Sequence, residues 1–278
     1  MGLKAMMVVS DPDIAAFVAS EGLDRLFVDL EVMGKAARQP GDTWKSALTL
    51  ADVPPIRAAA PEAEMLVRLN PPHAETGAEV AGALAAGADL LMVPMVREAR
   101  DVAEVLSVID GRCGLVPLIE TASGLAAIED IAALGPSEVY FGLNDLHLDL
   151  GARFMFEPLA EGRLDGAAEV LRTARIPFGI GGVARAGDGA VPAELILGEH
   201  ARLGSEWVIL SRGFYGRAAT VSDMRAAVDF RAELARLKAI HAAHTAAGPE
   251  ALATNRRHFV DAVASVVARL TPERTRDL

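Results

Sequence analysis

Eight short apolar runs recur at fairly even spacing, and they constrain the fold of this chain more than any other feature. Each run is rich in Val, Ile and Leu and is bounded by polar residues or glycine, which is typical of parallel strands buried on both faces. The predicted strands are 5–10, 25–31, 65–70, 90–95, 115–121, 138–145, 177–183 and 207–212.

Alanine-rich stretches with helical periodicity separate these runs. The predicted helices include 75–86, 98–109, 125–134, 159–174 and 192–203, with a long helix over about 223–244. Because parallel strands need covering crossovers, the alternation predicts an α/β fold with a parallel sheet. Eight such units favour a (β/α)₈ TIM barrel, for which 278 residues is a suitable length. A doubly wound open sheet is the alternative.

Two segments depart from the alternation. Residues 34–55 contain Pro40, Gly41 and Trp44 and read as a long loop, a type of segment that often carries function. After Gly248-Pro249, apolar residues recur at helical spacing to Leu270. We therefore expect a barrel over 1–245 and an extra C-terminal amphipathic helix within 246–278, packed on its own barrel or on a neighbouring subunit.

Charge and cysteine content limit the setting of the protein. The formal net charge is 27 − 38 = −11, which disfavours nucleic acids and anionic membranes as partners. The single cysteine, Cys113, cannot form an intramolecular disulfide, and the apolar start is too short to span a membrane. We expect a soluble, cytoplasmic protein.

Polar residues follow several of the predicted strands, at the end of a barrel where catalysis takes place. Glu120 and Asp145 end consecutive strands, which lie about 4.8 Å apart. Two carboxylates this close repel each other unless a cation lies between them, and they suit Mg²⁺ or Mn²⁺. The alternative is a salt bridge to Arg68 or Arg212.

Other polar residues near strand ends complete the predicted site. Arg68 is suited to bind a substrate carboxylate through two parallel hydrogen bonds. The proton-transferring base is predicted to be Glu31, His73 or a metal-bound water. The predicted substrate-binding residues are Arg68, Asn70, Asn144, Ser211 and Arg212.

A run of glycines, Gly179-Ile180-Gly181-Gly182, has two interpretations. Its backbone N–H groups could bind phosphate with help from Arg185 and Arg212, as loops after the last two strands of many barrels do. Alternatively, the glycines only permit tight packing at a strand end.

Five segments, taken together, resemble the HpcH/HpaI aldolase and citrate lyase β-subunit superfamily. They are FVDLE (27–31), VRLNP (67–71), GADLLMVPMV (87–96), PLIETASGL (117–125) and YFGLNDLHLDLG (140–151). The resemblance implies an oligomeric TIM barrel, often with a C-terminal helix exchanged between subunits. It also implies a divalent metal held by Glu120 and Asp145, and contact between Arg68 and the substrate carboxylate or developing enolate.

The chain departs from that family in its proton-transfer residue. Pyruvate aldolases of the family usually carry a histidine just after the acidic residue that ends the second strand, whereas this chain has Val32-Met33 there. FVDLE leans towards the acyl-CoA lyases, but their IHP-type signature is replaced by FGIGGVA (178–184) and VILSRGF (208–214).

These observations predict a divalent-metal-dependent carbon–carbon lyase or aldolase. Its substrate is expected to be a 2-oxo acid of the pyruvate or oxaloacetate type, or an acyl-CoA, reacting through a metal-stabilised enolate. The alternatives are a non-catalytic or regulatory barrel derived from such an enzyme, and an enzyme acting on a phosphorylated sugar-like ligand. We expect a homo-oligomer, a trimer or hexamer.

Overall fold

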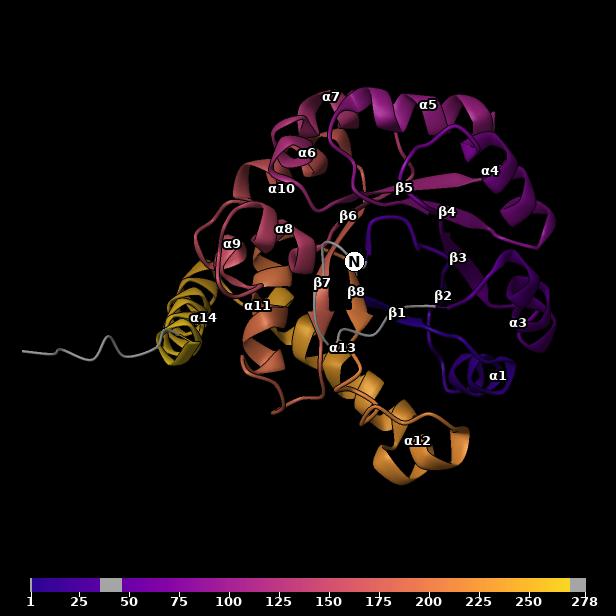
Figure 1. Ribbon diagram of the computed structural model, residues 1–278. Coiled ribbons are helices and arrows are strands. Elements are labelled where there is room, and N and C mark those ends of the chain that lie inside the picture. Colours follow the sequence, from indigo (N-terminus) through magenta and orange to yellow (C-terminus); the bar gives the residue numbers. More distant parts are fainter. Residues whose placement is uncertain (1, 36–46, 271–278) are drawn as a thin grey trace, which may run out of the picture.

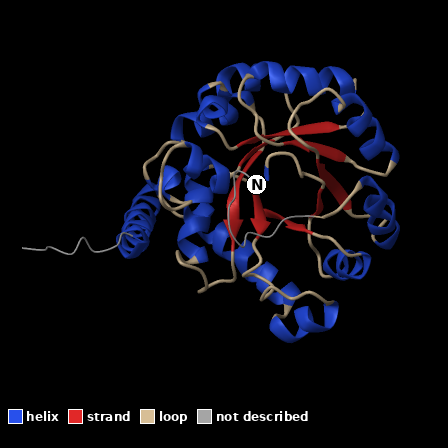
Figure 2. Cartoon of the chain, in the orientation of Figure 1, coloured by secondary structure: helices blue, strands red, loops and turns tan. Residues whose placement is uncertain are grey.

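The computed structural model describes residues 2–35 and 47–270. Eight parallel strands close into a barrel in which each strand pairs with the next along the chain, and the last pairs with the first. Strands form the inner ring and helices the outer ring (Figures 1 and 2). The predicted (β/α)₈ TIM barrel is confirmed. No helix in the described part of the chain is long and apolar enough to cross a membrane.

All eight apolar runs form strands, but most of the predicted runs continue past the observed ends. The strands are β1 (Lys4–Val8), β2 (Arg25–Asp29), β3 (Glu64–Arg68), β4 (Leu90–Val93), β5 (Gly114–Ile119), β6 (Val139–Phe141), β7 (Phe178–Val183) and β8 (Trp207–Leu210). The prediction was most wrong for β6, which ends at Phe141 and not at Asp145. Gly142 caps a new helix there, so Asp145 lies in a helical first turn.

The helices cover the outside of the barrel. They are α1 (Pro12–Ser20), the 3₁₀ helix η1 (Leu50–Asp52), α3 (Val53–Ala59), α4 (Thr76–Ala85), α5 (Ala99–Ile109), α6 (Ala122–Ala126), α7 (Ile128–Ala133), α8 (Leu143–Asp149), α9 (Glu157–Ala160), α10 (Asp165–Ala174), α11 (Ala193–Leu203), α12 (Val221–Ala227), α13 (Phe230–Ala246) and α14 (Pro249–Leu270).

Three of the predicted helices are each divided in two. The predicted 125–134 and 159–174 stretches hold α6 with α7 and α9 with α10. The predicted 223–244 helix breaks where Val228 is extended (φ −155°, ψ 139°) and the Asp229 side chain accepts a hydrogen bond from Ala232 N, which starts α13. The predicted 34–55 loop is wrong from Leu50 onward, where η1 and α3 lie, and its 36–46 part falls outside the described residues.

Large side chains fill the barrel interior and close its amino-terminal end. Arg25 is buried, donates two hydrogen bonds to Glu138 and stacks 3.7 Å from the centroid of Trp207. A Cβ on Gly179 would lie 2.2 Å from the Tyr140 ring. Polar and aromatic groups therefore seal this end, and the opposite, carboxyl end remains for ligands.

Helix α14 packs on its own barrel, beside α9 and α11 (Figure 1). Phe259 meets Phe156 edge to face at 6.1 Å, and Asn255 Nδ2 donates to Leu195 O at 3.1 Å. A Cβ on Gly198 would lie 2.1 Å from Asn255 Nδ2, so glycine permits this close helix approach. Within one chain the helix therefore packs on its own barrel, and packing on a neighbouring subunit stays a prediction.

Candidate active site

A cluster of six charged residues lies at the carboxyl end of the barrel. Asp29 is the last residue of β2, Arg68 the last of β3, and Glu120 follows β5. The other members are Glu31, Lys35 and Asp145, and all of the acidic members and Lys35 are buried. Such a concentration of buried charge is unfavourable without a function or a bound ion to compensate it.

Arg68 and Asp29 form the fixed centre of this cluster. The parallel register of β2 and β3 places them side by side. Arg68 Nε donates to Asp29 Oδ1 and Nη2 to Oδ2, each at 2.8 Å. Burial alone would raise the pKa of Asp29, but the Arg68 and Lys35 cations outweigh it and lower that pKa to about 2. Asp29 is therefore a carboxylate that orients cations and does not take up protons.

Glu31 and Lys35 stand next to this pair. Lys35 Nζ donates to Asp29 Oδ2 at 2.6 Å and lies 3.7 Å from Glu31 Oε2. Glu31 Oε2 also lies 3.4 Å from Arg68 Nη2. Glu31 is thus close to two cations, but neither contact has the short geometry of the Asp29 pairs.

The loop that carries these residues is held in place by Asn70. Its Oδ1 accepts hydrogen bonds from Val32 N and Met33 N, both at 2.9 Å, and its Nδ2 donates to Glu79 at 2.7 Å. Gly34 then turns the chain with φ of 71°, a conformation that favours glycine, and Lys35 follows with a buried side chain.

Glu120 is a buried carboxyl with an unusual pKa. Its Oε1 accepts a hydrogen bond from Met95 N at 3.0 Å, and Met95 adopts φ of 56° there. Burial raises the pKa of Glu120 to about 8, the Arg68 charge opposes the rise, and the Asp145 and Glu31 charges add to it. The ionised form of Glu120 therefore has too little positive charge nearby to stabilise it.

Asp145 approaches Glu120 from α8 and not from a strand end. Its helix starts at Gly142, where a Cβ would lie 2.7 Å from Glu120 Oε2 and 3.0 Å from Glu120 Cβ. The missing side chain lets the Glu120 carboxylate lie against the start of α8. Glycine at this position thus permits the close approach of Glu120 to the start of the helix that carries Asp145.

Glu120 and Asp145 have the chemistry of a site for a hard divalent cation. A cation beside them would supply the positive charge that the raised pKa of Glu120 shows to be missing. Among the described residues there is no group of three or more His, Cys, Asp or Glu side chains arranged as metal ligands. Two protein carboxylates suit Mg²⁺ or Mn²⁺, whose remaining ligands are commonly water and substrate oxygens.

The other predicted site residues are less closely associated with this cluster. His73 Nδ1 lies 3.1 Å from Pro71 O in its own loop. Asn144 precedes Asp145 in α8, while Ser211 and the exposed Arg212 follow β8. The Asn70 side chain holds the loop, as described above. Their roles in substrate binding and proton transfer stay predictions.

Packing accounts for two glycines of the 179–182 run. Gly179 makes room for the Tyr140 ring, and Gly181 has φ of 49° while its carbonyl accepts a hydrogen bond from Tyr140 Oη at 2.6 Å. The register of β7 against β8 shifts between Gly179 and Gly182. These contacts support the packing interpretation of the run.

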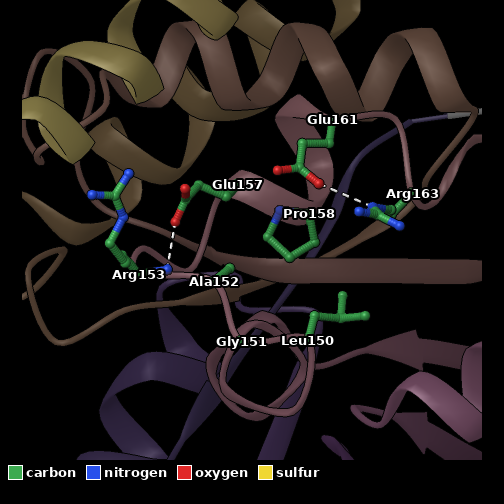
Figure 3. Close-up of a pocket in the computed structure, with 8 residues that line it drawn as sticks. All are labelled: Leu150, Gly151, Ala152, Arg153, Glu157, Pro158, Glu161 and Arg163. Atoms are coloured by element: carbon green, nitrogen blue, oxygen red, sulfur yellow. Dashed lines mark hydrogen bonds and ion pairs between the residues drawn. The ribbon is translucent and has the colours of Figure 1, made fainter.

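A separate pocket of about 160 Å³ lies beside α9 (Figure 3). Arg163 Nε pairs with Glu161 at 2.9 Å, and Glu157 accepts a hydrogen bond from Arg153 N at 2.6 Å. Both acidic residues of the pocket thus have partners, and the pocket contains no residue of the charged cluster.

The sequence patterns missed the parts played by Asp29 and Lys35. Asp29 could have been paired with Arg68 by aligning the ends of two adjacent predicted strands. Lys35 lies beyond the strand in the predicted loop, so only the fold of the Asn70-anchored turn brings it back over Asp29.

Comparisons with known proteins identify the family of the chain and agree with its fold. The family model for HpcH/HpaI aldolase/citrate lyase matches residues 6–176. No curated protein matches the chain in sequence. Among solved structures, an HpcH/HpaI aldolase from Desulfitobacterium hafniense DCB-2 shares the fold with a TM-score of 0.59 and 20% identity, over 76% of this chain and 86% of its own.

Two further structures share the fold over 81% of this chain. An HpcH/HpaI aldolase/citrate lyase family protein from Burkholderia cenocepacia J2315 has a TM-score of 0.62 and 18% identity over 94% of its length. The citrate synthase SbnG has a TM-score of 0.60 and 17% identity over 93% of its length.

Proposed function

Because the chain belongs to the HpcH/HpaI aldolase/citrate lyase family, we propose that it is a divalent-metal-dependent carbon–carbon lyase or aldolase. Its substrate is a 2-oxo acid of the pyruvate or oxaloacetate type, or an acyl-CoA. One observation carries the proposal: buried Glu120, with a pKa raised to about 8 by burial and by neighbouring Asp145 and Glu31, lies within reach of the Arg68 charge.

Glu120 and Asp145 would hold Mg²⁺ or Mn²⁺. When bound, the cation supplies positive charge close to the oxygens of a substrate that become negative in the reaction. Arg68 supplies the second positive charge, and its bidentate pairing with Asp29 keeps the guanidinium in one orientation before substrate arrives.

Glu31 is the proposed proton acceptor of the site. It is buried next to Arg68 and Lys35, and in cleavage it would take the proton from the hydroxyl of the substrate as the carbon–carbon bond breaks. It would then give this proton to the carbon of the resulting enolate, and the reverse of that second step is the exchange of methyl hydrogens. His73 and a water molecule stay alternative acceptors. The backbone contacts of Asn70 hold the Glu31 loop, so Asn70 would contribute by positioning.

Hydrogen exchange tests the proposal without knowledge of the second product. We expect the protein with Mg²⁺ or Mn²⁺ to exchange deuterium from solvent into pyruvate, oxaloacetate or the acyl methyl group of an acyl-CoA, measured by NMR. Glu120→Ala and Asp145→Ala should abolish exchange and keep the far-UV circular dichroism of the barrel. The control Glu129→Ala removes an exposed carboxylate in α7 and should have no effect. Full exchange by either site variant in chelator would reject the proposal.

A non-catalytic or regulatory barrel is the second candidate, favoured by Val32 and Met33. They directly follow buried Glu31, and neither has a titratable side chain, so neither can take the place of the histidine that related pyruvate aldolases use for proton transfer. Bound metal without exchange into any of the three substrate types would support this candidate.

We also propose that the protein is a homo-oligomer of three or six subunits, and sedimentation analysis would measure the number of subunits.

A further inference from the structure

Lys35 is a buried lysine to which the proposed mechanism gives no role. Its side chain is 7% exposed, and its ammonium group contacts the carboxylates of Asp29 and Glu31. Burying an ammonium group is costly, so a lysine in this position is favourable only because carboxylates surround it. The positive charge of Lys35 therefore offsets part of the negative charge of the site.

The site divides its four carboxylates into two pairs. Arg68 and Lys35 both contact Asp29 and Glu31, at distances between 2.6 and 3.7 Å. Glu120 and Asp145 form the other pair, and the charge of Asp145 acts directly on Glu120. When ionised, four carboxylates and two cations leave a net charge of 2 − 4 = −2, which matches one divalent ion.

Glu31 lies on the boundary between these pairs. Its charge acts on Glu120, yet its Oε2 atom faces Arg68 and Lys35. Arg68 Nη2 and Lys35 Nζ both donate to Asp29 and lie 3.4 and 3.7 Å from Glu31 Oε2, so Lys35 adds to the attraction that Arg68 exerts on Glu31. With the Lys35 charge removed, Glu31 is held less strongly, and a divalent ion at Glu120 would attract it as a third carboxylate ligand.

We propose that Lys35 is a positioning residue that keeps Glu31 out of the coordination shell of the cation, so that Glu31 stays available to accept a proton from substrate. This inference rests on the proposed function, because it presupposes a cation at Glu120 and Asp145. It predicts that removing the lysine charge tightens metal binding while it slows the reaction. A lysine that served only to stabilise the fold would not separate the two effects in this way.

Mn²⁺ binding, measured by electron paramagnetic resonance, gives the first readout. We expect Lys35→Met to bind Mn²⁺ about tenfold more tightly than the unchanged protein, because a positive charge is lost near the ion and Glu31 gains access to it. The double variant Lys35→Met/Glu31→Gln should bind Mn²⁺ only slightly more tightly than Glu31→Gln alone, because only the direct effect of the lost charge remains. This cycle isolates the part of the effect that passes through Glu31.

Pyruvate methyl exchange gives the second readout. Lys35→Met should slow exchange by about 100-fold, the size of effect expected when a proton acceptor is misplaced. Lys35→Arg retains the positive charge and should restore both the Mn²⁺ affinity and most of the exchange rate. The matched control Lys238→Met removes a lysine that pairs with Asp24 from the outer helix α13, and it should change neither readout.

The outcomes separate this inference from the proposed function. Suppose that the wild-type protein catalyses exchange and that Lys35→Met keeps the wild-type melting temperature. Unchanged or weaker Mn²⁺ binding by Lys35→Met would then overturn the role of Lys35 alone. Loss of exchange in Lys35→Arg with normal Mn²⁺ affinity would also overturn it, because a retained charge should suffice for positioning. Absence of Mn²⁺ binding in the wild-type protein would overturn the proposed function together with this inference.

Discussion

The Arg68 guanidinium is joined to the Asp29 carboxylate by two parallel hydrogen bonds of 2.8 Å, across the end of two neighbouring barrel strands. A third donor, Glu31 N, contacts Asp29 Oδ1 at 3.1 Å, and Lys35 Nζ contacts Oδ2. Asp29 is thus the residue around which the cations and the proposed base of the site are ordered.

Replacing Arg68 should impair the reaction more than metal binding. Arg68→Lys keeps one positive charge but cannot form the two-point contact with Asp29, so its charge is no longer fixed in direction. We expect a loss of about 100-fold in kcat/KM for pyruvate exchange, with Mn²⁺ affinity within a few-fold of normal. Arg100→Lys, on the exposed surface of α5, serves as the control. Equal activity of the two variants would contradict this role for Arg68.

Gly142 should be required for the proposed metal site although it carries no side chain. In Gly142→Ala, the new Cβ would lie 2.7 Å from Glu120 Oε2, so the carboxylate must move. We expect Mn²⁺ affinity to fall by at least about tenfold, measured by titration. Gly166→Ala in α10 places its Cβ in open space, and we expect normal Mn²⁺ affinity from this control. Normal affinity in Gly142→Ala would show that the position of Glu120 is not critical.

Asn70 should act through the backbone of the loop that it holds. Asn70→Ala removes the acceptor of two backbone N–H groups, at Val32 and Met33. We expect a loss of about 1–2 kcal/mol in the free energy of unfolding, measured in urea, and slower pyruvate exchange, because Glu31 and Lys35 lose their anchored loop. A variant with reduced stability but full exchange would contradict the positioning role.

Acid should destabilise the fold through buried His200. Burial, together with the nearby charge of His241, lowers the pKa of His200 from 6.5 to about 3, and its Nδ1 lies 2.9 Å from Ser205 Oγ. Between these pH values the unfolded chain binds more protons than the folded one, so stability falls as pH decreases below 6.5. One such histidine contributes a slope of up to about 1.4 kcal/mol per pH unit.

The measurement is urea unfolding at pH 7.5, 6.0 and 5.0. We expect His200→Asn to lose less stability between pH 7.5 and 5.0 than the wild-type protein does. His258→Asn, which changes an exposed histidine in α14, should keep the wild-type slope. Identical slopes for all three proteins would show that His200 is not the group responsible.

The barrel could be predicted from the sequence because buried parallel strands leave a simple pattern. All eight apolar runs contain a strand, since residues such as Val67 and Leu91 must be apolar on either face of the sheet. The predicted strand ends were less accurate. After Phe141 the chain starts a helix capped by Gly142, and the apolar run alone does not mark that change.

The sequence could predict only those residues of the site that are polar and lie at predicted strand ends. Arg68, Glu120 and Glu31 lie at or next to strand ends, where the sequence predicted the polar residues of the site, whereas Asp145 lies in α8 and not at a strand end. Lys35 could not be placed, because its approach to Asp29 depends on the Gly34 turn and on two hydrogen bonds to Asn70 from the preceding backbone. Such long-range contacts have no local pattern in the sequence.

The most direct test of the account is anomalous X-ray diffraction from crystals soaked with Mn²⁺ and pyruvate. We expect one strong Mn²⁺ peak between the carboxylates of Glu120 and Asp145, with pyruvate oxygens completing the shell and Arg68 on the side of the substrate. Crystals of Glu120→Gln should lose the peak. A Mn²⁺ ion bound elsewhere, or pyruvate bound without contact to these carboxylates, would contradict the proposed chemistry.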